Sequence, residues 1–131
     1  MKLLKTNGDL LRARKSMDDM ELRQLSRSKN REVRKRVAEN ENSPLDVLER
    51  LSADRNPEVR IAVAENDNTP VDVLVRLADD PSPEVRYTLA SSPPWIATDI
   101  LGKLEKDTNP LVAARAQASS QYLRSLNFRI A

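Results

Sequence analysis

The feature that most constrains the fold is a repeat with a period of 26 residues. The phrase Asn56-Pro57-Glu58-Val59-Arg60 returns as Ser82-Pro83-Glu84-Val85-Arg86, with an earlier copy from Asn30 and a degenerate one from Asn109. A second phrase, Ser43-Pro44-Leu45-Asp46-Val47-Leu48, returns at the same spacing as Thr69-Pro70-Val71-Asp72-Val73-Leu74. Self-similarity at one fixed period is typical of a solenoid, in which each unit packs only on its neighbours.

Each phrase has the pattern of a helix start. A residue whose side chain can accept hydrogen bonds from backbone N–H groups is followed by proline, which suits the first helical position. These expected N-cap residues are Ser43, Asn56, Thr69, Ser82 and Asn109. Asp46 and Asp72 stand where they can close a capping box. Two starts per period leave room for two helices of about two turns each, and we expect one of the two to be irregular or 3₁₀.

The apolar residues are spaced for helices that bury one face. Val59 and Val63 are four residues apart, and Val47, Leu48 and Leu51 fall on one face of the neighbouring expected helix. Helices this short are not stable alone, so each repeat must bury its apolar stripe against the next. The sequence therefore predicts an all-α solenoid of two-helix repeats.

We expect one domain over residues 1–131. Residues 1–29 are predicted to be a basic N-terminal cap with a degenerate repeat that Ser16 caps, 30–118 the repeats, and 119–131 a C-terminal cap or tail. The first helix is expected to be interrupted at Asn7-Gly8. Apolar residues expected to belong to the two caps are Leu3, Leu4, Leu10, Leu11, Tyr122, Leu126 and Phe128.

The unit from Asn56 to Asp80 closely resembles the leucine-rich repeat variant family. The matching positions are Asn56-Pro57, Val59-Arg60, Val63-Ala64, Asn66, Thr69-Pro70, Leu74, Leu77-Ala78 and Asp80. The resemblance implies a bacterial protein, a right-handed superhelix that alternates α- with 3₁₀-helices, and a binding scaffold with no shared ligand. A more distant resemblance is to HEAT-like repeats, whose units of roughly 40 residues are longer. One architecture of the family adds a cysteine-rich segment with an iron–sulfur cluster, and this chain has no cysteine to hold it.

The composition narrows the chemistry further. The chain has neither cysteine nor histidine, which excludes haem, zinc sites of the Cys/His type and triad chemistry that needs those residues. We therefore expect no enzyme activity, no cofactor and no metal site. No segment approaches the roughly 20 apolar residues of a membrane helix, and no apolar run of secretory length follows the basic start. A cytoplasmic protein is the resulting expectation.

Two charged columns and one amide column recur with the repeat. The aspartates are Asp54, Asp80 and Asp107, the arginines are Arg34, Arg60 and Arg86, and the asparagines are Asn40 and Asn66. Paired carboxylates can serve acid–base catalysis, but equivalent acids in successive repeats are separated by the whole repeat rise. We therefore expect each aspartate to cap a turn and to pair with an arginine, and the asparagines to form a ladder at helix ends.

Positions that vary between repeats suggest where a partner binds. The residue after each Val-Arg is Lys35, Ile61 and Tyr87 in turn. One interpretation is an outward strip that binds a protein and comprises Arg34, Lys35, Arg60, Ile61, Arg86 and Tyr87, with Trp95 at its edge, because aromatic residues and arginine are enriched at binding hot spots. The other is that the variable residues pack under the next helix and that Trp95 fills a gap in the core.

The charge distribution supports an alternative function. Residues 1–36 contain twelve Lys and Arg against five acids, a net charge of +7, and the remaining residues carry −5. The expected basic patch comprises Arg12, Arg14, Lys15, Arg31, Lys35 and Arg36. Clustered cations bind nucleic acid or other polyanions, but they also occur as a solvated cap. We expect a monomer or a weak oligomer.

Overall fold

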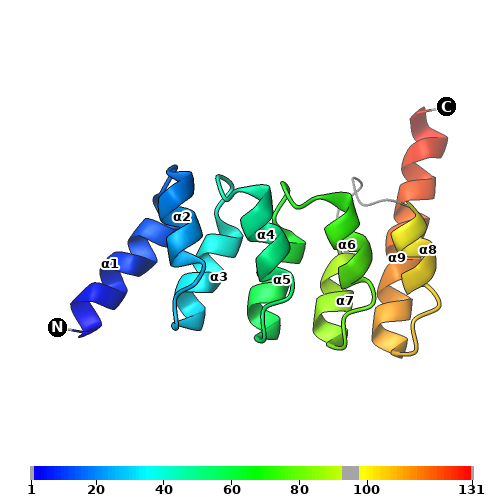
Figure 1. The fold of residues 1–131 in the computed structure, drawn as a ribbon. Coiled ribbons are helices and arrows are strands. Elements are labelled where there is room, and N and C mark those ends of the chain that lie inside the picture. Colours follow the sequence, from blue (N-terminus) through cyan, green and yellow to red (C-terminus); the bar gives the residue numbers. More distant parts are fainter. Residues whose placement is uncertain (1, 93–97, 131) are drawn as a thin grey trace. The chain divides into compact units, whose positions relative to one another are not determined.

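The computed structural model describes residues 2–92 and 98–130, with side chains described for residues 6–92 and 98–126. Throughout this part of the chain the regular elements are α-helices (Figure 1). The helices are α1 (Lys2–Lys15), α2 (Asp19–Leu25), α3 (Arg31–Glu39), α4 (Leu45–Leu51), α5 (Pro57–Glu65), α6 (Val71–Leu77), α7 (Pro83–Ala90), α8 (Thr98–Leu104) and α9 (Pro110–Ile130). The predicted all-α repeat architecture is confirmed.

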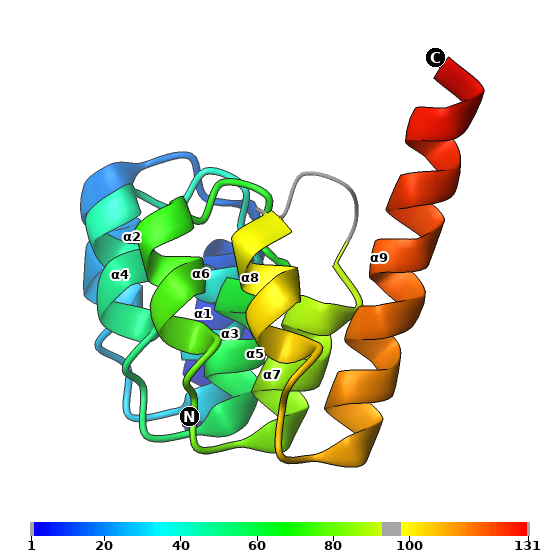
Figure 2. The same cartoon turned by 90° about the vertical axis from the view of Figure 1, so that its right-hand side faces the viewer.

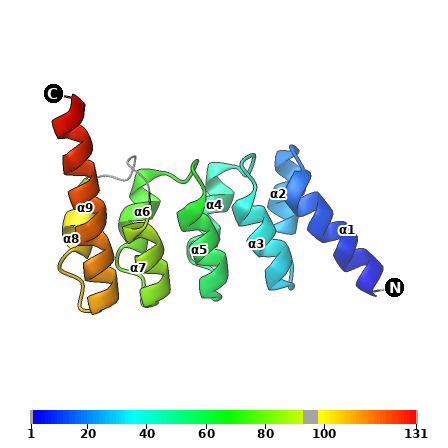
Figure 3. The same cartoon turned by 180° about the vertical axis from the view of Figure 1, so that it is seen from behind.

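The chain forms two compact units. Unit 1 comprises Met1–Pro70 and unit 2 comprises Val71–Ala131. In unit 1, α3 packs between α1 and α5, while α2 and α4 cover the same layer (Figure 3). In unit 2, α9 packs against both α7 and α8, and its C-terminal half extends beyond them (Figure 2). The single domain over 1–131, its inner boundaries and the right-handed superhelix stay predictions.

The predicted core is confirmed in both units. Val33, Val37, Val59 and Val63 are at most 1 % exposed, and Leu48 faces them fully buried. In unit 2 the buried apolar residues are Val73, Leu77, Ala78, Val85, Leu89, Ala90, Ile100, Leu101, Leu104, Val112 and Ala116. Each short helix therefore buries one apolar stripe, as the spacing requires.

The expected 3₁₀ helix is not found among the described residues. In α4 the Leu48 N–H donates to the carbonyl of Pro44 at 3.1 Å, and the Ser52 N–H donates to that of Leu48 at 2.9 Å, which is the α-helical pattern. The tighter pattern is confined to helix ends, where the Asp54 N–H donates to the Leu51 carbonyl at 3.0 Å. Burial of Val47, Leu48 and Leu51 on one face fits the α-helical period, which explains the difference.

Only some of the expected N-caps act as caps. Asn56 accepts from the Glu58 N–H at 2.9 Å, and Asn109 accepts from the Leu111 N–H at 2.9 Å, as predicted. Ser43 and Thr69 instead donate their hydroxyls back to the carbonyls of Val37 and Val63, each at 2.6 Å. Each hydroxyl thus closes the loop onto the preceding helix. The extended backbone of Pro44, with ψ 151°, makes the proline itself the cap of α4.

Three further local expectations are wrong. Ser82 bonds to the carboxylate of Glu84 at 2.7 Å, so its side chain does not cap α7. Asp46 pairs with Arg23 instead of closing a capping box. The degenerate repeat is capped by Asp18, which accepts from the Glu21 N–H at 2.9 Å, because α2 begins later than Ser16 requires.

The two ends of the chain also differ from expectation. α1 continues through Asn7-Gly8 without a break, since one glycine costs a helix only about 1 kcal/mol. Tyr122 is 60 % exposed and Leu126 is half-buried, so Tyr122 does not cover the core, and the side chain of Phe128 lies outside the described residues. In α9 Gln117 is exposed at the position of Ala38, Ala64 and Ala90, which are buried. A polar residue at that position is typical of a capping helix in a repeat protein.

Candidate functional site

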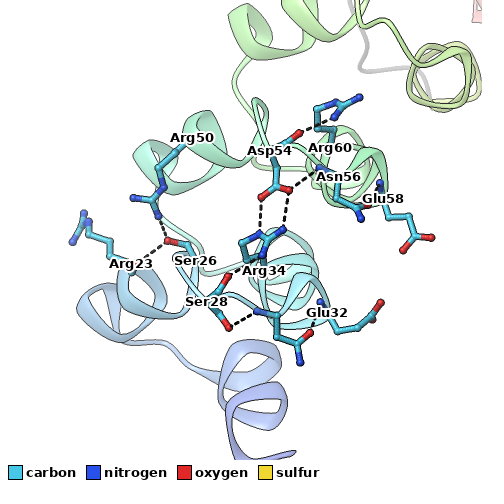
Figure 4. Close-up of polar contacts among 11 residues, drawn as sticks. Arg23, Ser26, Ser28, Glu32, Arg34, Arg50, Asp54, Asn56, Glu58 and Arg60 are labelled. Atoms are coloured by element: carbon cyan, nitrogen blue, oxygen red, sulfur yellow. Dashed lines mark hydrogen bonds and ion pairs between the residues drawn. The ribbon is translucent and has the colours of Figure 1, made fainter. Parts of the chain in front are cut away.

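The arginine and aspartate columns form buried ion pairs inside the units. In unit 1, Arg34 Nε and Nη2 donate to Asp54 Oδ2 and Oδ1 at 2.7 and 3.2 Å, and both side chains are only 8 % exposed (Figure 4). Arg34 Nη1 also donates to the carbonyl of Ser28 at 2.8 Å. Asp54 accepts in addition from the Asn56 N–H at 2.9 Å. This network joins the turns of successive repeats and satisfies both charges.

Unit 2 repeats the arrangement. Arg86 donates to Asp107 at 2.8 and 3.1 Å and to the carbonyl of Asp80 at 2.7 Å, and Asp107 accepts from the Asn109 N–H at 2.8 Å. The hydrogen bonds from Arg86 hold the pKa of Asp107 below its usual range, more than burial raises it. Arg60 makes the matching bond to the carbonyl of Asp54 at 2.7 Å. The predicted pairing is confirmed for Arg34 with Asp54 and for Arg86 with Asp107.

These contacts bury or occupy the three arginines of the expected binding strip. Arg34 is buried, so its guanidinium is not available to a partner, and Arg60 and Arg86 are half-buried with donors committed to turn carbonyls. The structure therefore gives no support to a binding role of the arginines, because their guanidinium groups form hydrogen bonds within and between the repeats.

The variable positions have unequal exposure. Lys35 and Ile61, on α3 and α5 of unit 1, are half-buried, whereas Tyr87 on α7 of unit 2 is 44 % exposed. Trp95 lies outside the described residues. The strip as a whole stays a prediction, and Tyr87 is its most accessible described member.

The asparagines form the predicted ladder. Asn66 Nδ2 donates to the carbonyls of Ala38 and Asn40 at 2.8 and 3.1 Å. Asn40 Nδ2 makes the same contacts one repeat earlier, with the carbonyls of Ala13 and Ser16 at 2.9 and 3.0 Å. Each side chain satisfies carbonyl groups at the helix end of the preceding repeat. The ladder therefore has a structural role.

Exposed apolar residues lie on two adjoining helices, α7 and α9, and the sequence interpretation included only Tyr87 of them in its binding strip. In α9, Leu111 is 71 % exposed and Tyr122 is 60 % exposed. Ala118 and Tyr122 follow Leu111 by seven and eleven residues, so the three residues share one helix face. Ala114 is also exposed and stands at the position equivalent to Tyr87 on the adjoining helix. We call Tyr87, Leu111, Ala114, Ala118 and Tyr122 the α7/α9 face. The sequence signal that could have revealed this face is the spacing of its apolar residues at the helical period.

The expected basic patch is only partly ion-paired. Arg12 pairs with Asp9 and with Glu21, the latter at 3.6 Å, and Arg36 pairs with Glu39 at 2.8 Å. The remaining four residues form no ion pair within the described part of the chain: Arg14, Lys15 and Arg31 are exposed and Lys35 is half-buried. α1 and α3 adjoin, and the Asn40 bonds join their C-terminal ends. The six residues thus lie on two neighbouring helices.

The described residues contain neither a metal-binding cluster nor a helix that could span a membrane. Among them no three acidic side chains lie close enough together to bind a metal ion. Within the same residues, no helix combines the length and the apolar character needed to cross a membrane.

Comparison with known families identifies the repeat. The family model named leucine rich repeat variant matches residues 31–56 and again residues 57–82. No curated protein and no solved structure matches the chain significantly. The two matched segments begin with α3 and α5, the helices that the 26-residue period relates. Residues 31–82 are therefore two leucine rich repeat variant repeats, and the chain is a helical repeat protein.

Proposed function

We propose that this chain is a non-enzymatic scaffold that binds a protein partner through the α7/α9 face. One observation carries the proposal: three large apolar residues, Tyr87, Leu111 and Tyr122, are 44 %, 71 % and 60 % exposed on two adjoining helices. Exposed apolar patches mark interaction surfaces, and aromatic residues are enriched among those that dominate binding energy. A cytoplasmic location and a bacterial origin remain part of the same proposal.

Leu111 gives the strongest support within this face. The equivalent residues of the other repeats are Glu32, Glu58 and Glu84, and an acid in the first turn is favoured by the helix dipole. Leucine at this position gives up that stabilisation and is left 71 % exposed. Neither packing nor capping accounts for it, whereas a partner that covers the residue would.

The scaffold itself leaves this face available. The repeated residues are used between the repeats: Arg86 and Asp107 pair, and Ser119 donates its hydroxyl to the carbonyl of Ala90 at 2.6 Å. α9 buries Val112 and Ala116 against its neighbours, which leaves its opposite side to solvent. A partner can therefore bind there without disturbing the core.

Site-specific photo-crosslinking tests the proposal. A photoreactive phenylalanine analogue placed at Leu111 or at Tyr87 is expected to cross-link one protein in an extract of the source cells. The matched control is the same analogue at Glu58, which is exposed and equivalent to Leu111 in unit 1. Equal yields of the same product from all three positions would contradict the proposed face.

A substitution at Leu111 provides the second test. Leu111→Glu installs the residue that the other repeats carry, so folding is retained while partner capture is lost. Gln117→Glu is the charge control, since it makes the same charge change at an exposed position on another side of α9 and loses only the 3.3 Å hydrogen bond from Gln117 Nε2 to the Glu105 carbonyl. Retained capture by Leu111→Glu would refute the role of this residue.

A second candidate function is polyanion binding through the basic patch. It is favoured by Arg14, Lys15 and Arg31, which are exposed and form no ion pair with the described residues. Nucleic-acid affinity would then fall steeply with salt, and Arg14→Glu with Arg31→Glu would reduce the salt slope. A mobility-shift assay at two salt concentrations tests it, and no shift at low salt would exclude it.

A further inference from the structure

The turns between short helices contain a pair of positions whose charges differ between the two units. In unit 2, Lys103 of α8 pairs with Asp79 at 2.5 Å. Lys103 is the next-to-last residue of α8, and Asp79 is the second residue after the end of α6. The residues at these two positions in unit 1 are Arg50 of α4 and Arg27 after α2. Unit 1 therefore has two like charges where unit 2 has an ion pair.

Arg50 hydrogen-bonds to a hydroxyl and forms no direct ion pair with a described carboxylate. Its Nη2 donates to the hydroxyl oxygen of Ser26, and that hydroxyl donates to the carbonyl of Arg23 at 2.6 Å (Figure 4). The carboxylate of the nearby Asp46 instead accepts two hydrogen bonds from Arg23, at 3.0 and 3.1 Å. Within the described residues Arg50 forms no ion pair.

Burial and a like charge both act on this guanidinium. Arg50 is half-buried, and burial lowers its pKa, with a further lowering from the charge of Arg27 that the charge of Asp46 partly offsets. Arg27 is exposed and directly follows Ser26, the residue to which Arg50 donates. Of the five N–H donors that a guanidinium carries, one on Arg50 is used by Ser26, which leaves donors for an external acceptor.

We propose that Arg27 and Arg50 form a carboxylate-binding site, in which Arg50 pairs with a carboxylate from an acidic segment of a protein partner as Lys103 pairs with Asp79 in unit 2. The planar fork of arginine matches a carboxylate in two hydrogen bonds, and the half-buried position of Arg50 reduces screening by salt. A carboxylate is chosen because Lys103, the cation at the position of Arg50 in unit 2, pairs with one. The inference rests on the proposed function only for the source of this carboxylate.

The test uses a fluorescent peptide of about eight glutamates, measured by anisotropy at about 20 mM and about 150 mM salt. Arg27→Asp supplies the site with an internal carboxylate, as in unit 2, and is expected to weaken peptide binding by about tenfold or more. Arg55→Asp is the matched control, with the same charge change at an exposed position of the same unit outside the basic patch, and an expected loss of less than about twofold. The melting temperature of Arg27→Asp is expected to equal or exceed that of the parent protein.

Three outcomes would overturn the site. Equal loss in Arg55→Asp would mean general attraction to a basic unit, and unchanged binding in Arg27→Asp would mean that the peptide binds elsewhere. Binding of an oligothymidylate that depends on Arg27, with no binding of the peptide, would assign the site to phosphate. Cross-linking from Leu111 in the Arg27→Asp protein separates the two proposals, because that reaction tests the α7/α9 face alone.

Discussion

Removal of the Asp54 carboxylate should destabilise the protein far more than removal of an exposed carboxylate from the same unit. Asp54 accepts two hydrogen bonds from Arg34 and a third from the Asn56 N–H, and the side chains of the ion pair are 8 % exposed (Figure 4). Asp54→Ala leaves the guanidinium of Arg34 buried with only the carbonyl of Ser28 as a partner. The charge then lacks both water and a counter-ion.

The expected cost follows from the parts that are lost. Loss of one partner of a buried ion pair costs about 3–5 kcal/mol. Asp54→Asn removes the charge but keeps an acceptor for the Asn56 N–H, so we expect about 2–3 kcal/mol. The control Glu39→Ala breaks an ion pair with Arg36 whose side chains are 33 % and 38 % exposed, and we expect less than about 1 kcal/mol.

Urea denaturation followed by circular dichroism measures these differences. With a slope near 2 kcal/mol per molar urea, Asp54→Ala is expected to lower the midpoint by roughly 1.5–2.5 M. The double variant Arg34→Met with Asp54→Leu removes both charges and is expected to be more stable than Asp54→Ala. If Asp54→Ala costs no more than Glu39→Ala, the ion pair does not stabilise the joint between repeats, and the reasoning is refuted.

Three further predictions concern the ladder, a titrating carboxylate and the caps. Asn66→Ala removes two hydrogen bonds that its amide donates and one that it accepts, and is expected to cost about 2–3 kcal/mol in thermal unfolding; an unchanged melting temperature would contradict the ladder. Arg86 lowers the pKa of Asp107 in the folded state. The ionised carboxylate therefore stabilises the fold at any pH above the pKa of an unfolded aspartate, about 3.9. This stabilisation is lost as the pH falls through the lower pKa of the folded state. The protein should therefore lose more stability than Asp107→Asn between about pH 5 and about pH 2, and parallel curves in urea titrations would show the pairing to be unimportant. Asn56→Ala should cost about 1 kcal/mol and Ser82→Ala less than about 0.5 kcal/mol by urea denaturation, since only Asn56 binds a backbone N–H; equal costs would mean that the caps do not differ.

The helices and the core could be predicted from the sequence because they depend on local spacing. Val59 and Val63 repeat at the helical period and are fully buried, and Asn56 precedes Pro57 in the order that a capped helix requires. The aspartate and arginine columns were also predictable as pairs, since both recur with the repeat. These features need no knowledge of how the turns are shaped.

The direction of the polar side chains could not be predicted in the same way. Ser43 looked like an N-cap, but its hydroxyl donates to the Val37 carbonyl, and that choice depends on the path of the loop. Arg27 and Arg50 are 23 residues apart in sequence, and only the folded chain places Arg50 against Ser26, the residue before Arg27. Contacts between repeats are set by tertiary geometry.

The sequence by itself determined the repeat, the helical period and the apolar stripe, because a fixed spacing of valine, leucine and proline admits few other folds. Only the tertiary structure decided which charged and apolar side chains are exposed to a partner. Arg34 is withdrawn into a buried pair, whereas Leu111 and Tyr87 remain in solvent although apolar residues are usually buried. Burial depends on which neighbouring helix covers a residue, and that property belongs to the packed chain as a whole.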